Sequence, residues 1–285
     1  MDNKHAYCIM AHSDWSQLQK LINSIDDKRC DIFLHIDAKV YNEFHNQGGA
    51  KVLFSQLYEV EFPVDVRWSD VTLADAEVSL FNKVISTGNN YSYIHLISGV
   101  DMPLINKKRL YSFFEGRDEE FLELDFNKNF RKRLKYYHYF VKRRRHNVFY
   151  DNLRRLLLLP QLLFVDRLQK CPLIYAHGPE WCSITMDAVY EIAQSYKQYR
   201  YIFEKTTCAD THYKQMILYS SDKHFRFAKE GNLRFVIFDE PAPSPRTLSM
   251  HEYEQMMASG ALFARKFEEH TDVFEKIYKQ INKLE

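Results

Sequence analysis

The first hundred residues alternate between strand-like and helix-like stretches, and this alternation limits the fold more than any other feature. Four apolar runs have the composition of buried strands, the last of them short: 6–10, 31–37, 91–97 and 51–54. Between them, 13–25 and 72–85 carry apolar side chains at helical spacing. Alternation at these lengths predicts an α/β fold, with a mostly parallel sheet covered by helices on both faces.

Short polar signatures follow three of the predicted strands. They are "AHSD" at 11–14, "HID" at 35–37 and "SGVD" at 98–101. Sheets of this class bind ligands beyond the carboxyl ends of their strands, so His12 and Asp101 are candidate ligand-binding residues. The alternative for Asp101 is an aspartate that caps a turn through nearby backbone amides. For His12 the alternative is a structural role.

Several function classes lack their usual signatures. The chain contains no GxGxxG, GxxxxGK[ST], HExxH or GxSxG motif, which argues against dinucleotide, P-loop and common hydrolase sites. With 39 basic and 38 acidic residues, no overall field favours nucleic acid. Five scattered cysteines without a CxxC pair suit reduced thiols. No stretch has the length of a membrane span or a signal-peptide core, so we expect a cytoplasmic protein.

A change of composition marks the stretch from about 128 to 170. It is crowded with Lys, Arg and Tyr and then with Leu, as in "LLLLPQLLF". One interpretation is a solvated basic helix followed by a core helix. Another is an insertion on an anionic membrane surface, with Arg143, Arg144 and Arg145 among the cations. Nucleic-acid binding ranks third. Residues 1–285 are expected to form a single domain that carries this stretch as a helical insertion.

The second half holds further charged residues at expected element boundaries. Asp210 stands where a helix is predicted to begin, and a helix cap is the alternative to a functional role. Arg265 and Lys266 lie between Phe263 and Phe267 at a predicted helix start. Two cations at a helix amino terminus would attract phosphate.

Taken in order, six stretches resemble one enzyme family. They are "AYCIMAH", "HID", "YIHLISGVDMPL", "EWCSITMDAV", "ADTHYKQMI" and "SGALFARKF", and they span about residues 6 to 267. Together they resemble the core 2/I-branching β-1,6-N-acetylglucosaminyltransferases, a family that includes the peptide-O-xylosyltransferases, and suggest a bacterial-type member. "SGVDMP" with "FARKF" is the most specific pair.

The resemblance implies a GT-A-like domain that uses a UDP-sugar and inverts the anomeric centre without a metal ion or other cofactor. The chain has no DxD motif, and "ELD" at 123–125 is its nearest substitute. Cations then hold the departing diphosphate. Arg265 and Lys266 match the family's basic pair, and Arg246 is a second clamp by analogy. Asp37 matches the acid that contacts uridine, and the resemblance places Asp101 in the turn between the donor and acceptor sites.

The resemblance also implies an acceptor site. Glu123 matches a carboxylate that orients the acceptor sugar, and Arg131, with Arg133, lines that cleft in a looser alignment. Trp181 has an indole that can stack on a sugar, with core filling as its alternative.

The catalytic base is where the chain departs from the family. Inversion needs a carboxylate that takes the proton of the attacking hydroxyl. The family places a Glu after an Asp at a helix start, whereas this chain has Thr211 at that position. Either Asp210 or Glu180 supplies the carboxylate, or the protein binds nucleotide sugars without turnover.

The sequence therefore predicts an inverting, metal-independent glycosyltransferase. It would move a sugar, N-acetylglucosamine being the first choice and galactose or xylose the alternatives, to a hydroxyl of a saccharide acceptor. We expect that acceptor to be lipid-linked and to belong to a surface polysaccharide, with the enzyme in the cytoplasm or peripheral on the inner membrane face. Nucleic acid is not an expected partner.

Overall fold

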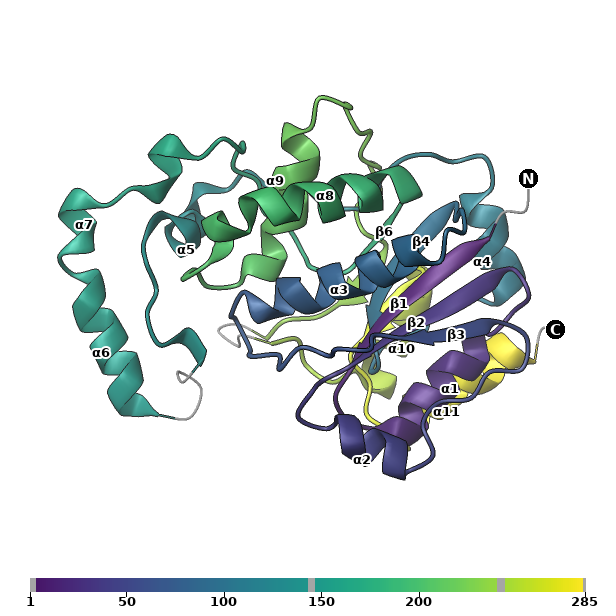
Figure 1. Ribbon diagram of the computed structural model, residues 1–285. Coiled ribbons are helices and arrows are strands. Elements are labelled where there is room, and N and C mark those ends of the chain that lie inside the picture. Colours follow the sequence, from purple (N-terminus) through teal and green to yellow (C-terminus); the bar gives the residue numbers. More distant parts are fainter. Residues whose placement is uncertain (1–3, 143–146, 240–243, 284–285) are drawn as a thin grey trace.

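The computed structural model describes residues 4–142, 147–239 and 244–283 and shows a five-stranded central sheet (Figure 1). Its strand order is β3-β2-β1-β4-β6. The strands are β1 (His5–Ala11), β2 (Cys30–Ile36), β3 (Gln56–Glu59), β4 (Tyr93–Ser98) and β6 (Cys182–Ile184). The first four run parallel, and β6 is antiparallel to β4. The predicted mostly parallel sheet is confirmed.

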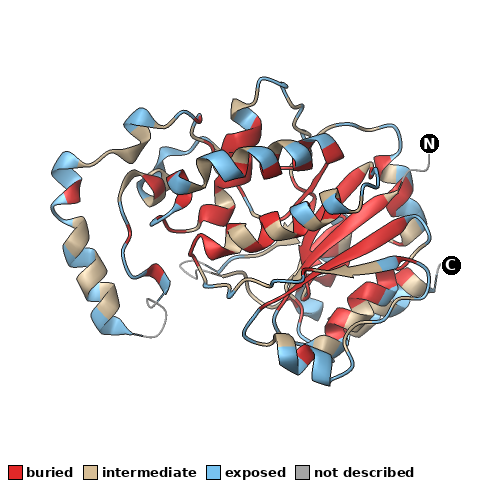
Figure 2. Ribbon diagram, in the orientation of Figure 1, coloured by how far each residue is buried: buried red, intermediate tan, exposed pale blue. Residues whose placement is uncertain are grey.

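Helices cover both faces of this sheet, as predicted. On one face lie α3 (Thr72–Ser86), α8 (Met186–Phe203) and α9 (Tyr213–Ser220). On the other lie α1 (Trp15–Ile25), α2 (Tyr41–Asn46), α4 (Lys107–Phe114), α10 (Tyr253–Ala258) and α11 (Asp272–Asn282). Each face of the sheet has its own hydrophobic core, and successive strand residues point to opposite faces. Ala6 and Cys8 pack in the first core, and Tyr7 and Ile9 pack in the second. Figure 2 shows the strands buried between these layers.

A second sheet of three short strands continues from the end of β4. It contains β5 (Met102–Pro103), β8 (Phe263–Arg265) and β7 (Arg234–Val236), with β8 in the middle. Arg265 is the last residue of β8, and the next helix begins only at Asp272. The prediction that Arg265 and Lys266 stand at a helix start is therefore wrong.

The prediction of a strand at 51–54 is also wrong, because β3 begins at Gln56. Leu53 is 85% exposed and Phe54 is 55% exposed. The Asp26 carboxylate accepts hydrogen bonds from the backbone amides of Leu53, Phe54 and Ser55. These bonds hold the segment as a turn that delivers the chain to β3.

Residues 128–142 and 147–170 form an arm of short helices beside the main body (Figure 1). It contains η1 (Lys128–Phe130), α5 (Lys132–Lys135), α6 (Val148–Leu158), α7 (Gln161–Phe164) and η3 (Arg167–Lys170). In Figure 1, α6 and α7 stand apart from the helices that cover the sheet. No residue of α6 is buried, so the interpretation of this Leu-rich stretch as a core helix is wrong. Arg143, Arg144 and Arg145 lie outside the described residues.

Two further 3-10 turns complete the described chain, η4 (Ala209–Thr211) and η5 (Met250–Glu252). None of the described helices has the length and apolar character needed to cross a membrane.

Candidate active site at the carboxyl edge of the sheet

Strand pairing brings distant charged residues together beyond the end of β4. Because β6 runs antiparallel to β4, with Leu96 opposite Cys182, the residues before β6 lie beside the turn that follows β4. Glu180 and Trp181 thereby approach Asp101. The pairing of β5 with β8, with Met102 opposite Ala264, places Arg265 at the same turn.

The Asp101 carboxylate stabilises this turn and also forms an ion pair with the Arg265 guanidinium. Its carboxylate accepts hydrogen bonds from the Ser98 amide at 3.1 Å and the Ser98 hydroxyl at 2.9 Å. Arg265 Nε lies 3.2 Å from Asp101 Oδ1. Burial raises the pKa of Asp101, and the Arg265 charge opposes that rise. The turn-capping alternative therefore holds, and Asp101 additionally orients Arg265.

Arg265 lies between two carboxylates and an indole ring. Besides Asp101, it donates from Nη1 to Glu180 Oε1 at 3.4 Å. Its guanidinium carbon lies 4.3 Å from the centre of the Trp181 ring, in cation–π contact. Trp181 is buried among core residues. Core filling therefore describes Trp181 better than stacking on a sugar does.

Glu180 and Asp210 are direct neighbours. The Gly178 amide donates to the Thr211 carbonyl at 3.0 Å, and Gln215 Nε2 donates to the Pro179 carbonyl at 2.9 Å. Burial and then the Asp210 carboxylate raise the pKa of Glu180 to about 8, while Arg265 opposes the rise. Burial raises the pKa of Asp210 as well. Two adjoining carboxyl groups of this kind cannot both ionise easily, so the pair holds one proton near neutral pH.

Gly178 sets the backbone of the loop that carries Glu180. A Cβ atom at this position would lie 2.1 Å from the carbonyl oxygen of Glu123, so only glycine fits. The same close approach places Glu123 beside the loop of Glu180, with its side chain exposed to solvent.

Behind Asp210 lies a buried ion pair that sequence reasoning missed. Lys214 forms a salt bridge with Glu77, and both side chains have zero exposure. Tyr213 donates to Glu77 Oε2 at 2.6 Å, and Lys214 Nζ also donates to the Asp210 carbonyl at 3.2 Å. Two features of the sequence could have indicated this pair: Lys214 follows Asp210 by four residues, and Glu77 lies on the apolar face of the helix predicted at 72–85.

The charges of this region nearly balance. Arg234 is a further cation, whose pKa burial lowers to about 10. It donates to the Cys182 carbonyl at 2.6 Å and the Ser183 hydroxyl at 3.1 Å. The cations are Arg234, Arg265 and Lys214, and the carboxyl groups are Asp101, Glu180, Asp210 and Glu77. Three positive charges against four carboxyl groups agree with one shared proton.

The Thr211 side chain takes part in local bonding only. Its hydroxyl donates to the Cys208 carbonyl at 2.9 Å, and it lies 3.0 Å from His212 Nδ1. Burial lowers the pKa of His212 to about 3, so the imidazole is neutral. Neither side chain replaces a carboxylate base.

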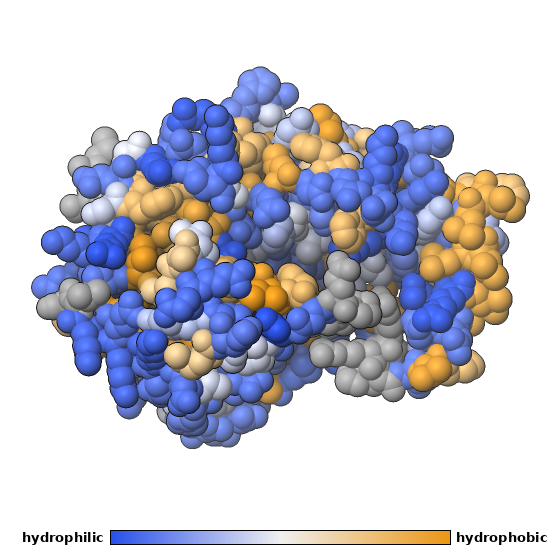
Figure 3. All heavy atoms as spheres, turned by 180° about the vertical axis from the view of Figure 1, so that it is seen from behind, coloured by the Kyte–Doolittle hydropathy of each residue, from blue (hydrophilic) through white to orange (hydrophobic). Residues whose placement is uncertain are grey.

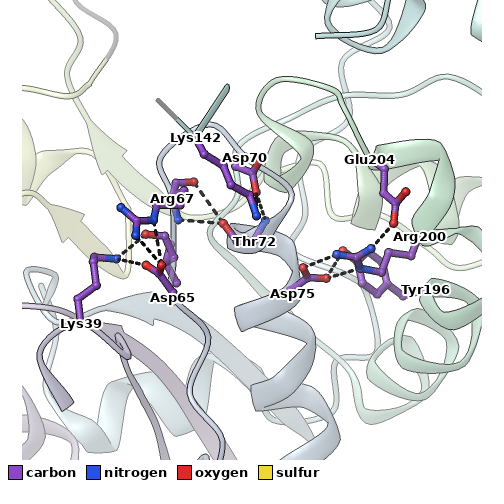
Figure 4. A network of polar contacts seen from close by, with 11 residues as sticks. Lys39, Asp65, Arg67, Asp70, Thr72, Asp75, Lys142, Tyr196, Arg200 and Glu204 are labelled. Carbon is purple, nitrogen blue, oxygen red and sulfur yellow. Dashed lines mark hydrogen bonds and ion pairs between the residues drawn. The ribbon is translucent and has the colours of Figure 1, made fainter. Parts of the chain in front are cut away.

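Asp37 lies at the same edge, beyond β2. It is buried and accepts from the Lys39 amide at 2.9 Å and from Lys39 Nζ at 2.6 Å. Lys39 Nζ also forms an ion pair with Asp65 at 3.0 Å, and Asp65 forms a second one with Arg67 at 2.6 Å, as Figure 4 shows. A cavity of about 460 Å³ adjoins this network, a volume in the range of small-molecule sites. It is lined by Val64, Asp65, Arg67, Thr72 and Lys142.

The other predicted donor residues surround the ends of β1, β7 and β8. His12 is exposed and follows Ala11, whose carbonyl accepts from the Asp37 amide at 3.0 Å. The Leu248 amide donates to the Lys266 carbonyl at 2.9 Å, so the segment of Arg246 runs beside Lys266. Arg246 pairs with Glu252 at 2.8 Å. Within the described part of the chain, Lys266 has no ion-pair partner.

The two predicted acceptor residues have different neighbours. Glu123 lies beside the Glu180 loop, and Arg131 forms a long ion pair with Asp166 in the arm at 3.9 Å. Phe130, next to Arg131 in the chain, stacks on His177 with ring centres 4.3 Å apart. Across residues 4–142, 147–239 and 244–283, no group of three or more His, Cys, Asp or Glu side chains is placed to hold a metal ion.

The sequence of the chain matches the family model of the core-2/I-branching enzymes over residues 5–258. The chain belongs to this family. Family membership makes it a glycosyltransferase, for which a nucleotide-sugar donor and a saccharide acceptor are implied. The match to the core-2/I-branching enzymes contains Asp101, Glu180 and Asp210 and ends before Arg265 and Lys266.

Other comparisons add little to this assignment. Among solved structures, the apo form of mouse xyloside xylosyltransferase 1 is similar, with 9% sequence identity and a TM-score of 0.37. The alignment covers 91% of this core-2/I-branching chain and 97% of the mouse chain. No curated protein sequence matches the chain.

Proposed function

We propose that this GT-A-like protein is an inverting glycosyltransferase whose base is the Glu180–Asp210 pair. The observation that carries the proposal is a pair of adjoining carboxyl groups between two cations, Arg265 on one side and Lys214 on the other. A raised and shared pKa suits a group that must accept a proton near neutral pH. The two separate candidates of the sequence analysis thus become one unit.

In the proposed reaction the acceptor hydroxyl attacks the anomeric carbon of the donor. Its proton passes to the ionised member of the Glu180–Asp210 pair, and the new glycosidic bond forms as the bond to the diphosphate breaks. UDP leaves with the bonding electrons. Direct displacement of this kind inverts the anomeric centre, and the proton leaves the pair after the products depart.

The departing diphosphate requires positive charge, which we assign to Lys266 with Arg246 as a second contact. Arg265 is already bound to Asp101 and Glu180. We therefore propose that Arg265 positions Glu180, which revises the equal roles first given to the Arg-Lys pair. With these cations the reaction would proceed without a metal ion or cofactor.

We assign the donor to the cavity lined by Asp65 and Arg67, with the uridine near Asp37 and the sugar toward Glu180. N-acetylglucosamine is the first candidate sugar, and galactose and xylose are the alternatives. We propose a saccharide acceptor, oriented by Glu123, that is lipid-linked and belongs to a surface polysaccharide assembled at the inner face of the cell membrane.

A second candidate function is nucleotide-sugar binding without turnover. One observation favours it: the Thr211 side chain is bonded to backbone and offers no carboxylate at the position where the family has glutamate.

The two candidates are separated by assaying a panel of UDP-sugars with the purified protein, in EDTA and with added Mn²⁺, while UDP affinity is measured on the same samples. Donor hydrolysis or transfer that persists in EDTA supports the metal-free enzyme. Tight UDP binding with no turnover of any donor would support the binding protein instead.

A further inference from the structure

The outer side of the arm exposes more large apolar side chains than a protein surface in water usually does. Its large apolar side chains are between 55% and 85% exposed: Phe149, Leu156, Leu159, Leu162, Leu163 and Phe164. Phe149 and Leu156 are seven residues apart in α6 and so share one helical face. Figure 3 shows apolar residues gathered on the arm at the right of that view. A patch of this kind marks a surface that binds a partner.

The charge of the arm indicates which partner. Residues 128–170 contain thirteen Lys or Arg and two Asp, a net charge of +11, whereas the whole chain carries +1. A cation adjoins the apolar residues of α6, since Arg155 precedes Leu156 and is 70% exposed at the side chain. The arm is therefore complementary to an anionic surface that also accepts apolar side chains.

Specific contacts hold the arm in this position. Gln161 bonds to both backbone groups of Tyr137, at 2.7 and 3.0 Å. Arg167 donates to the Ile202 carbonyl, at the end of α8, at 2.9 Å. These bonds join α7 to the segment that precedes α6 and join η3 to the end of α8.

We propose that the outer face of α6 and α7 binds an anionic phospholipid bilayer. The apolar side chains enter the interface, while the neighbouring Arg and Lys contact lipid phosphates. The phosphates of a nucleic acid would pair with the cations, but a nucleic acid provides no apolar environment in which to bury the aliphatic side chains of Leu159, Leu162 and Leu163. This binding is independent of the proposed catalysis, since no residue of α6 or α7 belongs to the candidate active site.

The test is co-sedimentation with phosphatidylcholine vesicles, with and without phosphatidylglycerol, at low and high salt. The variant is Leu163→Glu, and the matched control is Leu53→Glu. The two leucines are equally suited to substitution, being 80% and 85% exposed, but Leu53 lies outside the arm. Sedimentation velocity without lipid and RNA binding are measured on the same proteins.

Three results are expected together. The wild type binds phosphatidylglycerol vesicles, binds them less in high salt, and binds pure phosphatidylcholine weakly. Leu163→Glu weakens vesicle binding by about tenfold, since burial of a leucine side chain contributes on that order. Leu53→Glu leaves binding unchanged.

Equal vesicle binding by Leu163→Glu and the wild type would overturn the proposal, as would no vesicle binding by the wild type. Dimerisation abolished by Leu163→Glu, without vesicle binding, would assign the face to a second copy of the chain. Steeply salt-dependent RNA binding that Leu163→Glu does not affect would assign the arm to nucleic acid.

Discussion

Replacing Lys214 by methionine should destabilise the protein in a way that depends on pH. Lys214 and Glu77 are buried with zero exposure, so the substitution leaves the Glu77 carboxylate without its cation. Removing one partner of a buried ion pair costs about 3–5 kcal/mol. Glu77 can limit that cost by taking up a proton.

The proton uptake sets the size of the effect. The pKa of Glu77 rises from an ordinary value of 4.5 to about 7 even with Lys214 present, because burial outweighs the lysine charge. Without Lys214 the pKa rises further, so Glu77 stays protonated at pH 7. Because wild-type Glu77 is itself about half protonated at pH 7, keeping Glu77 protonated costs the variant only about 0.4 kcal/mol more than the wild type at pH 7, but about 2.7 kcal/mol more at pH 9. The sign agrees with linkage: a raised pKa favours folding at low pH and loses that benefit as pH rises.

The assay is urea unfolding of the wild type and Lys214→Met at pH 9 and pH 7, followed by circular dichroism. We expect a loss of about 2–3 kcal/mol at pH 9 and less than about 1 kcal/mol at pH 7. The double variant Lys214→Met/Glu77→Gln, which removes the buried charge, should recover most of the stability at pH 9. A single variant that loses the same amount at both pH values, or a double variant without recovery, would refute this reasoning.

Other expectations follow from the same structure. The free energy of unfolding should be greatest at about pH 6. Above it, stability falls until about pH 8, because the folded chain keeps protons on carboxyl groups whose pKa burial raises to about 7 or 8, Glu77, Glu120 and Glu180, whereas these groups are ionised in the unfolded chain. Below it, stability falls because the unfolded chain protonates four imidazoles that the folded chain keeps neutral, those of His5, His35, His95 and His212. Urea midpoints measured across this pH range test both the rise and the fall of stability, and a monotonic dependence on pH would contradict this expectation. Gly178→Ala should cost about 1–3 kcal/mol, since its Cβ would meet a backbone oxygen, and an unchanged thermal midpoint would count against the close contact. Lys266→Ala should weaken UDP binding in calorimetry by about tenfold or more, with unchanged affinity as the contrary outcome.

Local sequence patterns predicted the layers of the fold because apolar periodicity is a local signal. The strands at 6–10, 31–37 and 91–97 and the helices between them formed as expected. The run at 51–54 failed because its backbone amides bind Asp26, a contact over more than twenty residues that no local pattern contains.

The candidate site was predictable in part for the same reason. The turn at Asp101 follows directly from the end of a parallel strand. The position of Arg265 beside Asp101 depends on the pairing of β5 with β8, and the Lys214–Glu77 pair joins residues 137 positions apart. Contacts of that range follow from the assembled sheet and cannot be deduced from the spacing of residues.

The most direct test of the central claim compares turnover by the wild type with Asp210→Asn and Glu180→Gln, with UDP affinity measured in parallel. Asp222→Asn and Glu115→Gln, which change exposed carboxylates outside the site, serve as matched controls. If the Glu180–Asp210 pair is the base, both site variants lose transfer by about a hundredfold or more while retaining UDP binding and fold, and the controls keep wild-type rates. Transfer at the wild-type rate by both site variants would contradict the account.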